Sequence, residues 1–390
     1  MKKRRQNIGI LAFPICEPGD VPLPDDTKAG IVSFSNIVDV LSHFAPNLYV
    51  ITGNRKRILF KQDDNMHVFE VTHKSGANLF TKVARYIYTQ LRLSFNLAKL
   101  SRNVSLWVFY IGAEGVVLPM VTAKLLGKQT VLSLTGFPAQ VSKEQKAPFL
   151  TLMHLFPRIN LALANRIVVY TERIIGEQNL GKYRKNIYTA HQSLVDFGRL
   201  SRQKPLDQRR NLVGYIGRLS EEKGTLNFIE AIPRMLDKSS DISFLIGGDG
   251  PLRDKVEAYV NTANLGSKVK FIGWIPYDEL SGYLNDLKLL VVPSYSEGLP
   301  NIILEAMACG TPVLATAVGA IPDVITDSET GFILEENSPH GISSDIVRAL
   351  RHPDLEQITD NAYTLVEKEY TSDAAINSYK DVLASLKWLG

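Results

Sequence analysis

Short apolar runs alternate with stretches of helical periodicity in the second half of the chain, and this alternation constrains the fold more than any other feature. We expect strands at 212–216, 242–246, 269–272, 289–292 and 313–315, with helical patterns between them. Such alternation indicates βαβ units and a parallel sheet. Ligands of open parallel sheets bind beyond the carboxyl ends of the strands. The glycine-rich and polar clusters of this half follow those ends, which is the first indication of function.

The first half is less regular but of the same kind. It has apolar runs at 8–13, 48–51, 107–111, 131–134 and 167–170 and helical patterns near 31–43 and 80–100. A chain of 390 residues is too long for one ordinary hydrophobic core, which predicts two domains. The polar segment 199–210 reads as the linker between them.

The cysteine content and the charge distribution indicate the cellular compartment and the kind of partner. Cys16 and Cys309 are far apart in sequence, so we expect no disulfide framework and a reducing, cytoplasmic compartment. The basic start followed by a short apolar run reads as a first strand rather than a signal peptide. The formal net charge of +4 divides into +13 for residues 1–195 and −9 for residues 196–390. This asymmetry predicts an anionic partner for the first half.

The segment from Gly214 to Gly224, GYIGRLSEEKG, carries the first candidate site. Its strand ends at Gly217, where the missing side chain lets a ligand approach the backbone. Arg218 and Lys223 follow, and a planar guanidinium beside a mobile ammonium group suits a diphosphate. The alternative is a solvated turn with incidental charges. A second cluster, Gly247-Gly248-Asp249-Gly250, follows the next strand and is a weak signal on its own.

The strongest segment runs from Ser294 to Pro312. Pro300 suits the first position of a helix, and Gly310 followed by Pro312 ends it. The N–H groups of Gly298 and Leu299 would then face an anion at the helix N-terminus. Glu297 precedes this helix and Glu305 lies on it. Both carboxylates are either partners of the helix dipole or acceptors for sugar and ribose hydroxyls, and the second interpretation explains the pair better.

Taken together, these segments resemble a known family. GYIGRLSEEKG, GGDGP, FIGW, SEGLPNIILEAMACGTPVLAT, VGAIPDVI and TGFIL occur in the order of the retaining GT-B glycosyltransferases of family 4 and cover nearly all of residues 212–334. The first half resembles the family only in outline, with Gly30 opening a helix after the first strand. The resemblance implies an α/β fold of two Rossmann-like doubly wound domains that face each other across a cleft. Residues 1–198 would bind the acceptor, residues 205–372 the nucleotide-sugar donor, and the last helix, 373–390, would pack back on the first domain.

The resemblance also implies roles for single residues. Arg218 and Lys223 would neutralise the leaving nucleoside diphosphate, and Glu297 would contact the donor sugar, which makes these three the catalytic set. The other donor-binding residues would be Gly30, Gly217, Gly248, Trp274, Ile275, Gly298, Leu299 and Glu305. No metal and no cofactor is expected, since fixed cations take the place of a metal, the sequence has no Asp-x-Asp pair and its histidines lack metal-ligand spacing.

Two positions depart from the family pattern. Thr135 stands where the family has a histidine close to the donor sugar. Either Thr135 makes that sugar contact, or another residue makes it, or catalysis is weakened. Asp323 stands where the family often has glutamate. These departures leave two readings open: an active glycosyltransferase, or a catalytically weak partner or scaffold that binds nucleotide-sugar. A GT-B phosphorylase or epimerase is disfavoured, because the cations and carboxylates occur together in the transferase pattern.

A basic helix predicts where the first half meets its partner. No acidic residue lies between Glu70 and Glu114, and Arg85, Arg92 and Lys99 recur every seven residues on an otherwise largely apolar helix near 80–102. Such a helix favours peripheral contact with the inner face of a membrane and a lipid-linked or saccharide acceptor, in polysaccharide or glycolipid synthesis. The alternative is a surface helix whose basic stripe is solvated and whose apolar residues lie in the core. No nucleic-acid motif accompanies the charge.

Overall fold

The structure is a computed structural model that describes residues 6–12, 26–54, 65–72, 79–110, 112–134, 155–190 and 194–388. The chain divides into two compact units. The first comprises Met1–Gln192 and Ala375–Gly390, and the second comprises Ser193–Ala374. The first unit therefore ends six residues before the predicted boundary at 198, and the expected linker 199–210 belongs to the second unit.

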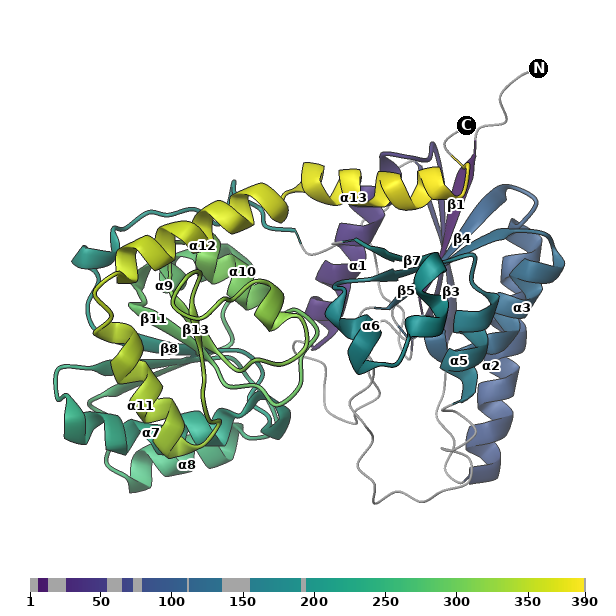
Figure 1. Ribbon diagram of the computed structural model, residues 1–390. Coiled ribbons are helices and arrows are strands. Elements are labelled where there is room, and N and C mark those ends of the chain that lie inside the picture. The colour runs from purple at the N-terminus through teal and green to yellow at the C-terminus, as the bar shows by residue number, and fades with distance from the viewer. Residues whose placement is uncertain are drawn as a thin grey trace. The chain divides into compact units, whose positions relative to one another are not determined.

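The first unit is built on a seven-stranded sheet in the order β3-β2-β1-β4-β5-β6-β7, and every pair in it is parallel (Figure 1). Its strands are β1 (Asn7–Ala12), β2 (Leu48–Asn54), β3 (Met66–Thr72), β4 (Val104–Tyr110), β5 (Gln129–Leu134), β6 (Arg166–Val169) and β7 (Ile187–Thr189). Its helices are α1 (Asp26–Ser42), α2 (Leu79–Leu100), α3 (Val117–Leu125), α5 (Leu155–Leu163), α6 (Arg173–Glu177) and most of α13 (Ser372–Ser385), with short 3₁₀ turns η1 (Ala113–Gly115) and η2 (Gly181–Asn186).

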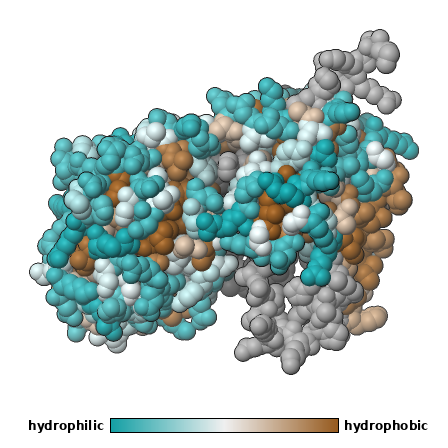
Figure 2. All heavy atoms as spheres, viewed as in Figure 1, coloured by the Kyte–Doolittle hydropathy of each residue, from teal (hydrophilic) through white to brown (hydrophobic). Residues whose placement is uncertain are grey.

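Burial explains which of these strands the sequence predicts. In β4, whose sequence is VSLWVFY, all but one residue is buried, as expected of a central parallel strand covered on both faces. Strands β3 and β7 lie at the two edges of the sheet and have no continuous apolar run, and the sequence analysis missed both. Figure 2 shows apolar side chains gathered over α2 and α3, on the right of the view.

The second unit contains a six-stranded parallel sheet in the order β10-β9-β8-β11-β12-β13. Its strands are β8 (Leu212–Ile216), β9 (Ser243–Gly247), β10 (Val269–Gly273), β11 (Leu289–Val292), β12 (Val313–Ala315) and β13 (Phe332–Ile333). Its helices are α7 (Thr225–Lys238), α8 (Arg253–Thr262), α9 (Tyr277–Asp286), α10 (Asn301–Ala308), α11 (Pro339–Leu350) and α12 (Leu355–Glu369), with 3₁₀ turns η3 (Leu206–Gln208), η4 (Glu221–Lys223) and η5 (Ile321–Asp323). The five strands predicted for this half are present within one residue, and only the two-residue β13 was missed.

Helices cover both faces of the second sheet. α7 packs on α8 and α11, while α10 packs on α9 and α12, and each group shares a buried core with the strands. The strand order reverses between β8 and β11, just as that of the first sheet reverses between β1 and β4. Both units are therefore doubly wound in the Rossmann manner, as predicted.

The last helix packs on the first unit. Arg166 donates to the carbonyl oxygen of Ser385 at 2.7 Å and to its hydroxyl at 2.8 Å. The indole N–H of Trp388 donates to the Ser105 hydroxyl at 2.9 Å, and Tyr379 is buried. Residues from the end of the chain therefore complete the fold of the unit that contains its beginning.

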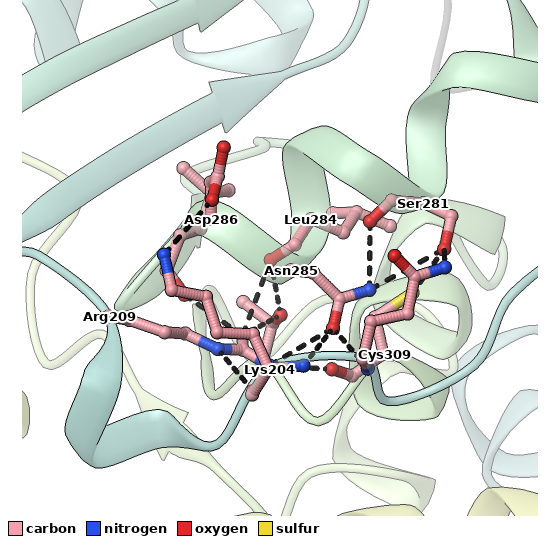
Figure 3. A network of polar contacts seen from close by, with 10 residues as sticks. Lys204, Arg209, Ser281, Leu284, Asn285, Asp286 and Cys309 are labelled. Atoms are coloured by element: carbon pink, nitrogen blue, oxygen red, sulfur yellow. Dashed lines mark hydrogen bonds and ion pairs between the residues drawn. The ribbon is translucent and has the colours of Figure 1, made fainter.

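A buried arginine fixes the start of the second unit (Figure 3). Arg209, 4% exposed, donates to the carbonyl oxygens of Lys204 (2.9 Å), Leu284 (3.3 Å), Leu287 (3.0 Å) and Cys309 (2.8 Å) and to the hydroxyl of Thr311 (2.7 Å). Several of these acceptors close the C-terminal ends of α9 and α10, where helix carbonyl groups lack intrahelical partners and favour a cation. Burial lowers the pKa of Arg209 to about 10. The expected linker is therefore an ordered segment bound at the amino ends of β8, β11 and β12.

The described residues contain neither a membrane-spanning helix nor a cluster of metal ligands. None of the helices there combines the length and the apolar character needed to cross a bilayer. No group of three His, Cys, Asp or Glu side chains in the same part of the chain could hold a metal ion.

Candidate functional site

The candidate site lies in the second unit, where its strand order reverses. β8 and β11 are neighbours at this point, and β9 and β12 lie on their outer sides. The loop 217–224 follows β8, and the loop 293–300 follows β11. Because all these strands are parallel, both loops emerge at the same edge of the sheet. An open α/β sheet binds its ligands in the crevice at such a reversal.

Glycine allows the strand ends to approach one another closely. The N–H of Gly217 donates to the carbonyl of Gly247 at 3.0 Å, and the N–H of Gly248 donates to the carbonyl of Gly273 at 2.6 Å. Gly248 has a φ of +128°, and a Cβ atom there would lie 1.8 Å from the carbonyl oxygen of Gly217. Only glycine fits such a position. The weak glycine-cluster signal therefore has a structural cause at the end of β9.

A buried tyrosine holds the loop after β8. The Tyr215 hydroxyl donates to the carbonyl oxygen of Arg218 at 2.6 Å and lies 2.8 Å from the hydroxyl of Thr225. Burial raises the pKa of Tyr215, so its hydroxyl keeps its proton. The loop closes at Gly224, where φ is +67° and a Cβ atom would lie 1.9 Å from the carbonyl oxygen of Pro293. The backbones of the two loops are thus in direct contact.

Lys223 and Glu297 join the two loops through their side chains. The Lys223 Nζ lies 2.6 Å from Glu297 Oε1, and the Ser294 hydroxyl donates to the same oxygen at 2.7 Å. The Glu297 side chain is 8% exposed and that of Lys223 is 29% exposed. An ammonium group and a carboxylate are therefore held together where the strand order reverses, and the cation remains open to solvent.

Arg218 lies beside a carboxylate of its own loop. Its guanidinium is 3.7 Å from Glu222 Oε1, which also accepts a hydrogen bond of 2.6 Å from the Ser220 hydroxyl. Burial alone would raise the pKa of Glu222, but the Ser220 hydrogen bond and the charge of Arg218 outweigh it and lower that pKa. The side chains of Arg218 and Glu222 are 41% and 50% exposed, so the guanidinium is accessible to a ligand.

The helix after β11 begins one residue later than predicted. α10 starts at Asn301, and Pro300 precedes it with an extended ψ of 122°, so Pro300 is the N-cap rather than the first helical residue. Gly298 and Leu299 lie just outside the helix. The carbonyl of Gly298 accepts a hydrogen bond of 2.8 Å from the N–H of Ala320. At the other end, Gly310 adopts a φ of +63°, as predicted for the residue that stops the helix.

Glu305 lies on the second turn of α10 and is partly buried. Within the described residues its carboxylate receives no hydrogen bond. Burial raises its pKa to about 7. A carboxyl group in this condition gains most from a ligand that brings hydroxyl donors, because they supply the hydrogen bonds that favour the ionised form.

Aromatic residues surround this edge of the sheet. Three large apolar side chains of the second unit are exposed, and all three come from segments that follow its strands: Trp274 (41%), Tyr277 (36%) and Tyr295 (58%). The neighbouring Ile275 is buried. Exposed aromatic rings are suitable surfaces for stacking a nucleobase.

Two predicted site residues do not belong to the second unit: Gly30 lies in the first unit, and Thr135 is not among the described residues. α1 begins at Asp26, so Gly30 lies in the second turn of that helix and does not open it, which corrects the expectation. Gly217, Arg218, Lys223, Gly248, Trp274, Ile275, Glu297, Gly298, Leu299 and Glu305 all belong to the second unit.

Sequence reasoning gave no role to several residues that shape the site. Ser294 and Tyr215 support Glu297 and the Arg218 backbone, respectively. Asn227 donates to the Tyr295 hydroxyl at 2.6 Å, and the N–H of Tyr295 donates to the carbonyl of Glu222 at 2.8 Å. Tyr215 lies within the motif GYIGRLSEEKG, and Ser294 lies two residues before the motif that begins at Ser296; these positions were the only available signal. The contacts of Asn227 depend on the tertiary fold.

Comparison with known proteins finds a family match in the second unit. The model of the family described as glycosyl transferases group 1 matches residues 196–364. The matched segment contains every candidate residue of the second unit.

Most of the curated relatives match only part of this chain. The 2-deoxystreptamine N-acetyl-D-glucosaminyltransferase of Niallia circulans is 28% identical over 148 residues, 38% of this chain and 38% of the relative. The N-acetyl-alpha-D-glucosaminyl L-malate synthase of Bacillus anthracis is 22% identical over 346 residues, 86% of this chain and 88% of the relative. The first three relatives are matched over 38%, 47% and 37% of their own lengths, so this chain spans less than half of each.

A solved structure resembles nearly the whole chain in fold. Anabaena Alr3699/HepE in complex with UDP superposes with a TM-score of 0.71 at 14% identity, over 97% of this chain and 100% of that chain. At this identity the likeness concerns the fold. It agrees with the two Rossmann-like units of a GT-B protein.

Proposed function

We propose that this protein is a retaining, metal-independent glycosyltransferase that moves a sugar from a nucleoside diphosphate-sugar to a lipid-linked or saccharide acceptor. The observation that carries the proposal is the Lys223–Glu297 pair at the reversal between β8 and β11. The match of residues 196–364 to glycosyl transferases group 1 supports it. Retention of configuration follows from the resemblance to family 4.

The proposed mechanism assigns the leaving group to the two cations. Negative charge grows on the diphosphate as the bond to the sugar breaks, and Arg218 and Lys223 stabilise that charge. At an effective dielectric constant near 20, each close pair of charges offers at most ~4 kcal/mol, or very roughly a thousandfold in rate. Two such cations are enough to replace a metal ion, so the reaction proceeds without one.

The remaining site residues hold the donor. The ribose hydroxyls donate to Glu305, the sugar lies against Glu297, and the distal phosphate accepts hydrogen bonds from the backbone of Gly298 and Leu299. The base lies near Gly248 and the chain at 274–275. Since Alr3699/HepE was solved with UDP, uracil is the first base to test.

The acceptor is proposed to meet the protein at a membrane. The first unit supplies the cations for contact with the inner, anionic face of a membrane, and Thr135 is the proposed contact of the donor sugar. None of these assignments requires a membrane-spanning segment.

Product analysis tests this proposal. Purified protein is incubated with UDP-, GDP- and ADP-sugars and an acceptor extract, with and without chelator, and the anomeric configuration of the product is read by NMR. The account expects transfer that resists the chelator and yields the donor's configuration. Glu297→Ala should lower turnover more than nucleotide affinity, and inverted product or loss of activity with chelator would contradict the mechanism.

A further inference from the structure

The exposed apolar side chains of the described residues are not scattered. Twelve large ones are exposed, and nine of them belong to three consecutive described helices of the first unit. Five lie on α2: Phe80 (81%), Ile87 (48%), Tyr88 (60%), Leu91 (55%) and Phe95 (71%). The others lie on α3 and its C-cap, where Leu125 is 83% exposed, and on α5. A contiguous apolar surface of this kind marks an interaction site.

The helix α2 is apolar on two different faces. Leu93 and Leu97 are fully buried in the core of the first unit. Phe80, Leu91 and Phe95 follow a spacing that places them together on another face, which points outward. Core packing therefore cannot account for this second apolar stripe.

The three helices form one fixed layer. The Gln90 side chain accepts hydrogen bonds of 2.9 Å from the N–H groups of Val117 and Leu118, which anchors the start of α3 to α2. The rings of Tyr86 and Phe156 stack with centroids 6.2 Å apart, which connects α2 to α5. Figure 1 shows α2, α3 and α5 side by side, and Figure 2 shows apolar residues over this layer. The exposed residues thus belong to one rigid surface.

The charge of this layer selects the partner. The three helices carry six cations and no Asp or Glu: Lys82, Arg85, Arg92, Lys99, Lys124 and Arg158. Cations beside exposed apolar residues suit an anionic lipid surface, where apolar side chains enter the acyl boundary and basic groups meet phosphate. A second copy of the chain would bring like charges such as Arg85, Arg92 and Lys99 against one another, which opposes self-association through this face.

We propose that the outward face of the α2–α3–α5 layer inserts into an anionic membrane, with Phe80, Leu91 and Phe95 entering the lipid and Arg85, Arg92 and Lys99 binding headgroups. This inference rests on the proposed function, because it states how the protein reaches a membrane-bound acceptor. It also makes a prediction that a purely electrostatic contact does not: binding persists in part at high salt, which screens the cations but not the apolar contacts.

Vesicle sedimentation of the full chain tests the surface. The probes are vesicles of phosphatidylcholine alone and of phosphatidylcholine with phosphatidylglycerol in equal parts. We expect tight binding to the anionic vesicles and much weaker binding to vesicles of phosphatidylcholine alone. The variant F80S/L91S/F95S should bind at least about tenfold more weakly, since each side chain loses apolar burial. R85Q/R92Q/K99Q should lose about fivefold per cation at low salt. K182Q/R184Q/K185Q removes equal charge from η2, outside the layer, and should bind like the parent.

Two controls keep the test decisive. The substituted side chains are exposed, so thermal unfolding of each variant should match that of the parent. UDP binding by the same preparations separates this surface from the donor site: UDP binding without vesicle binding overturns the membrane surface alone, and the reverse result overturns the function alone. Equal binding to both vesicle types, unchanged binding by F80S/L91S/F95S, or a dimer abolished by that variant would each overturn the proposal.

Discussion

The ammonium nitrogen of Lys223 lies 2.6 Å from a carboxylate oxygen of Glu297, although the two residues are 74 positions apart in the chain. One follows β8 and the other follows β11, so the pair exists only because these strands are neighbours. The Ser294 hydroxyl occupies the same carboxylate oxygen. Lys223 is thereby positioned before any ligand arrives, which is the condition for electrostatic stabilisation without rearrangement.

Breaking this pair should separate its structural role from its catalytic role. Lys223→Met leaves the nearly buried Glu297 carboxylate without its cation and should lower the free energy of unfolding by about 1–3 kcal/mol, less than for a fully buried pair because Lys223 is 29% exposed. Lys223→Met/Glu297→Gln should recover most of that stability in urea denaturation, and both variants should lose at least about a hundredfold in turnover. Full activity in the double variant would show that the pair is only structural.

The raised pKa of Glu305 should make stability depend on pH. The folded protein keeps the Glu305 proton up to about pH 7, whereas the unfolded chain releases it near the ordinary value of 4.5. Stability should therefore fall as pH rises from about 4.5 to about 7, by up to about 3 kcal/mol, and then stay constant. Denaturation at several pH values should show this slope in the parent and not in Glu305→Gln.

Nucleotide affinity should show the opposite trend with pH. Ribose hydroxyls bind the ionised Glu305, so affinity should rise towards pH 7 and level off above it. Glu305→Gln should lose the part of this pH dependence that comes from Glu305. Any dependence that remains in the variant comes from titration of the terminal phosphate of the nucleotide, so the variant is also the control for it. Calorimetry at several pH values measures the nucleotide affinity. Identical pH profiles in the parent and Glu305→Gln would show that Glu305 does not bind the ribose.

Two glycines of the candidate site should respond differently to alanine. At Gly248 the new Cβ atom would lie 1.8 Å from the Gly217 carbonyl oxygen, so Gly248→Ala should destabilise the protein by about 3 kcal/mol and abolish nucleotide binding. At Gly217 the nearest heavy atom is 3.8 Å away, so Gly217→Ala should leave stability within about 1 kcal/mol. Weaker nucleotide binding by a stable Gly217→Ala would place the ligand against this strand end. Unchanged affinity would place it elsewhere.

Arg209 should contribute to the stability of the fold and not to the turnover of the enzyme. Arg209→Lys cannot reproduce the planar set of donors to the carbonyl oxygens of Leu287 and Cys309, so it should cost about 3 kcal/mol or more in urea denaturation. Turnover of the folded fraction should be unchanged, because Arg209 lies at the amino ends of the strands. A loss of turnover without a loss of stability would give Arg209 a role that its position does not suggest.

The sequence predicts the features that local patterns determine and misses those that depend on contacts between distant parts of the chain. β8 and β11 have continuous apolar runs between clear breaks, and both were predicted with their exact bounds. β3 is an edge strand with partly exposed residues, so its pattern is weak. The contact between Lys223 and Glu297 depends on strand order, which no local pattern encodes. The two apolar faces of α2 likewise cannot be distinguished until the core is known.

The most direct test of the central claim is calorimetric binding of UDP, GDP and ADP to the full chain without metal, with Arg218→Ala as the control. The account predicts that one nucleotide, first of all UDP, binds selectively and that Arg218→Ala weakens this binding by at least about tenfold, because a charge-assisted contact to the diphosphate is lost. Absence of binding by all three nucleotides, or equal binding by Arg218→Ala, would contradict the assignment of the donor site to the edge of the sheet between β8 and β11.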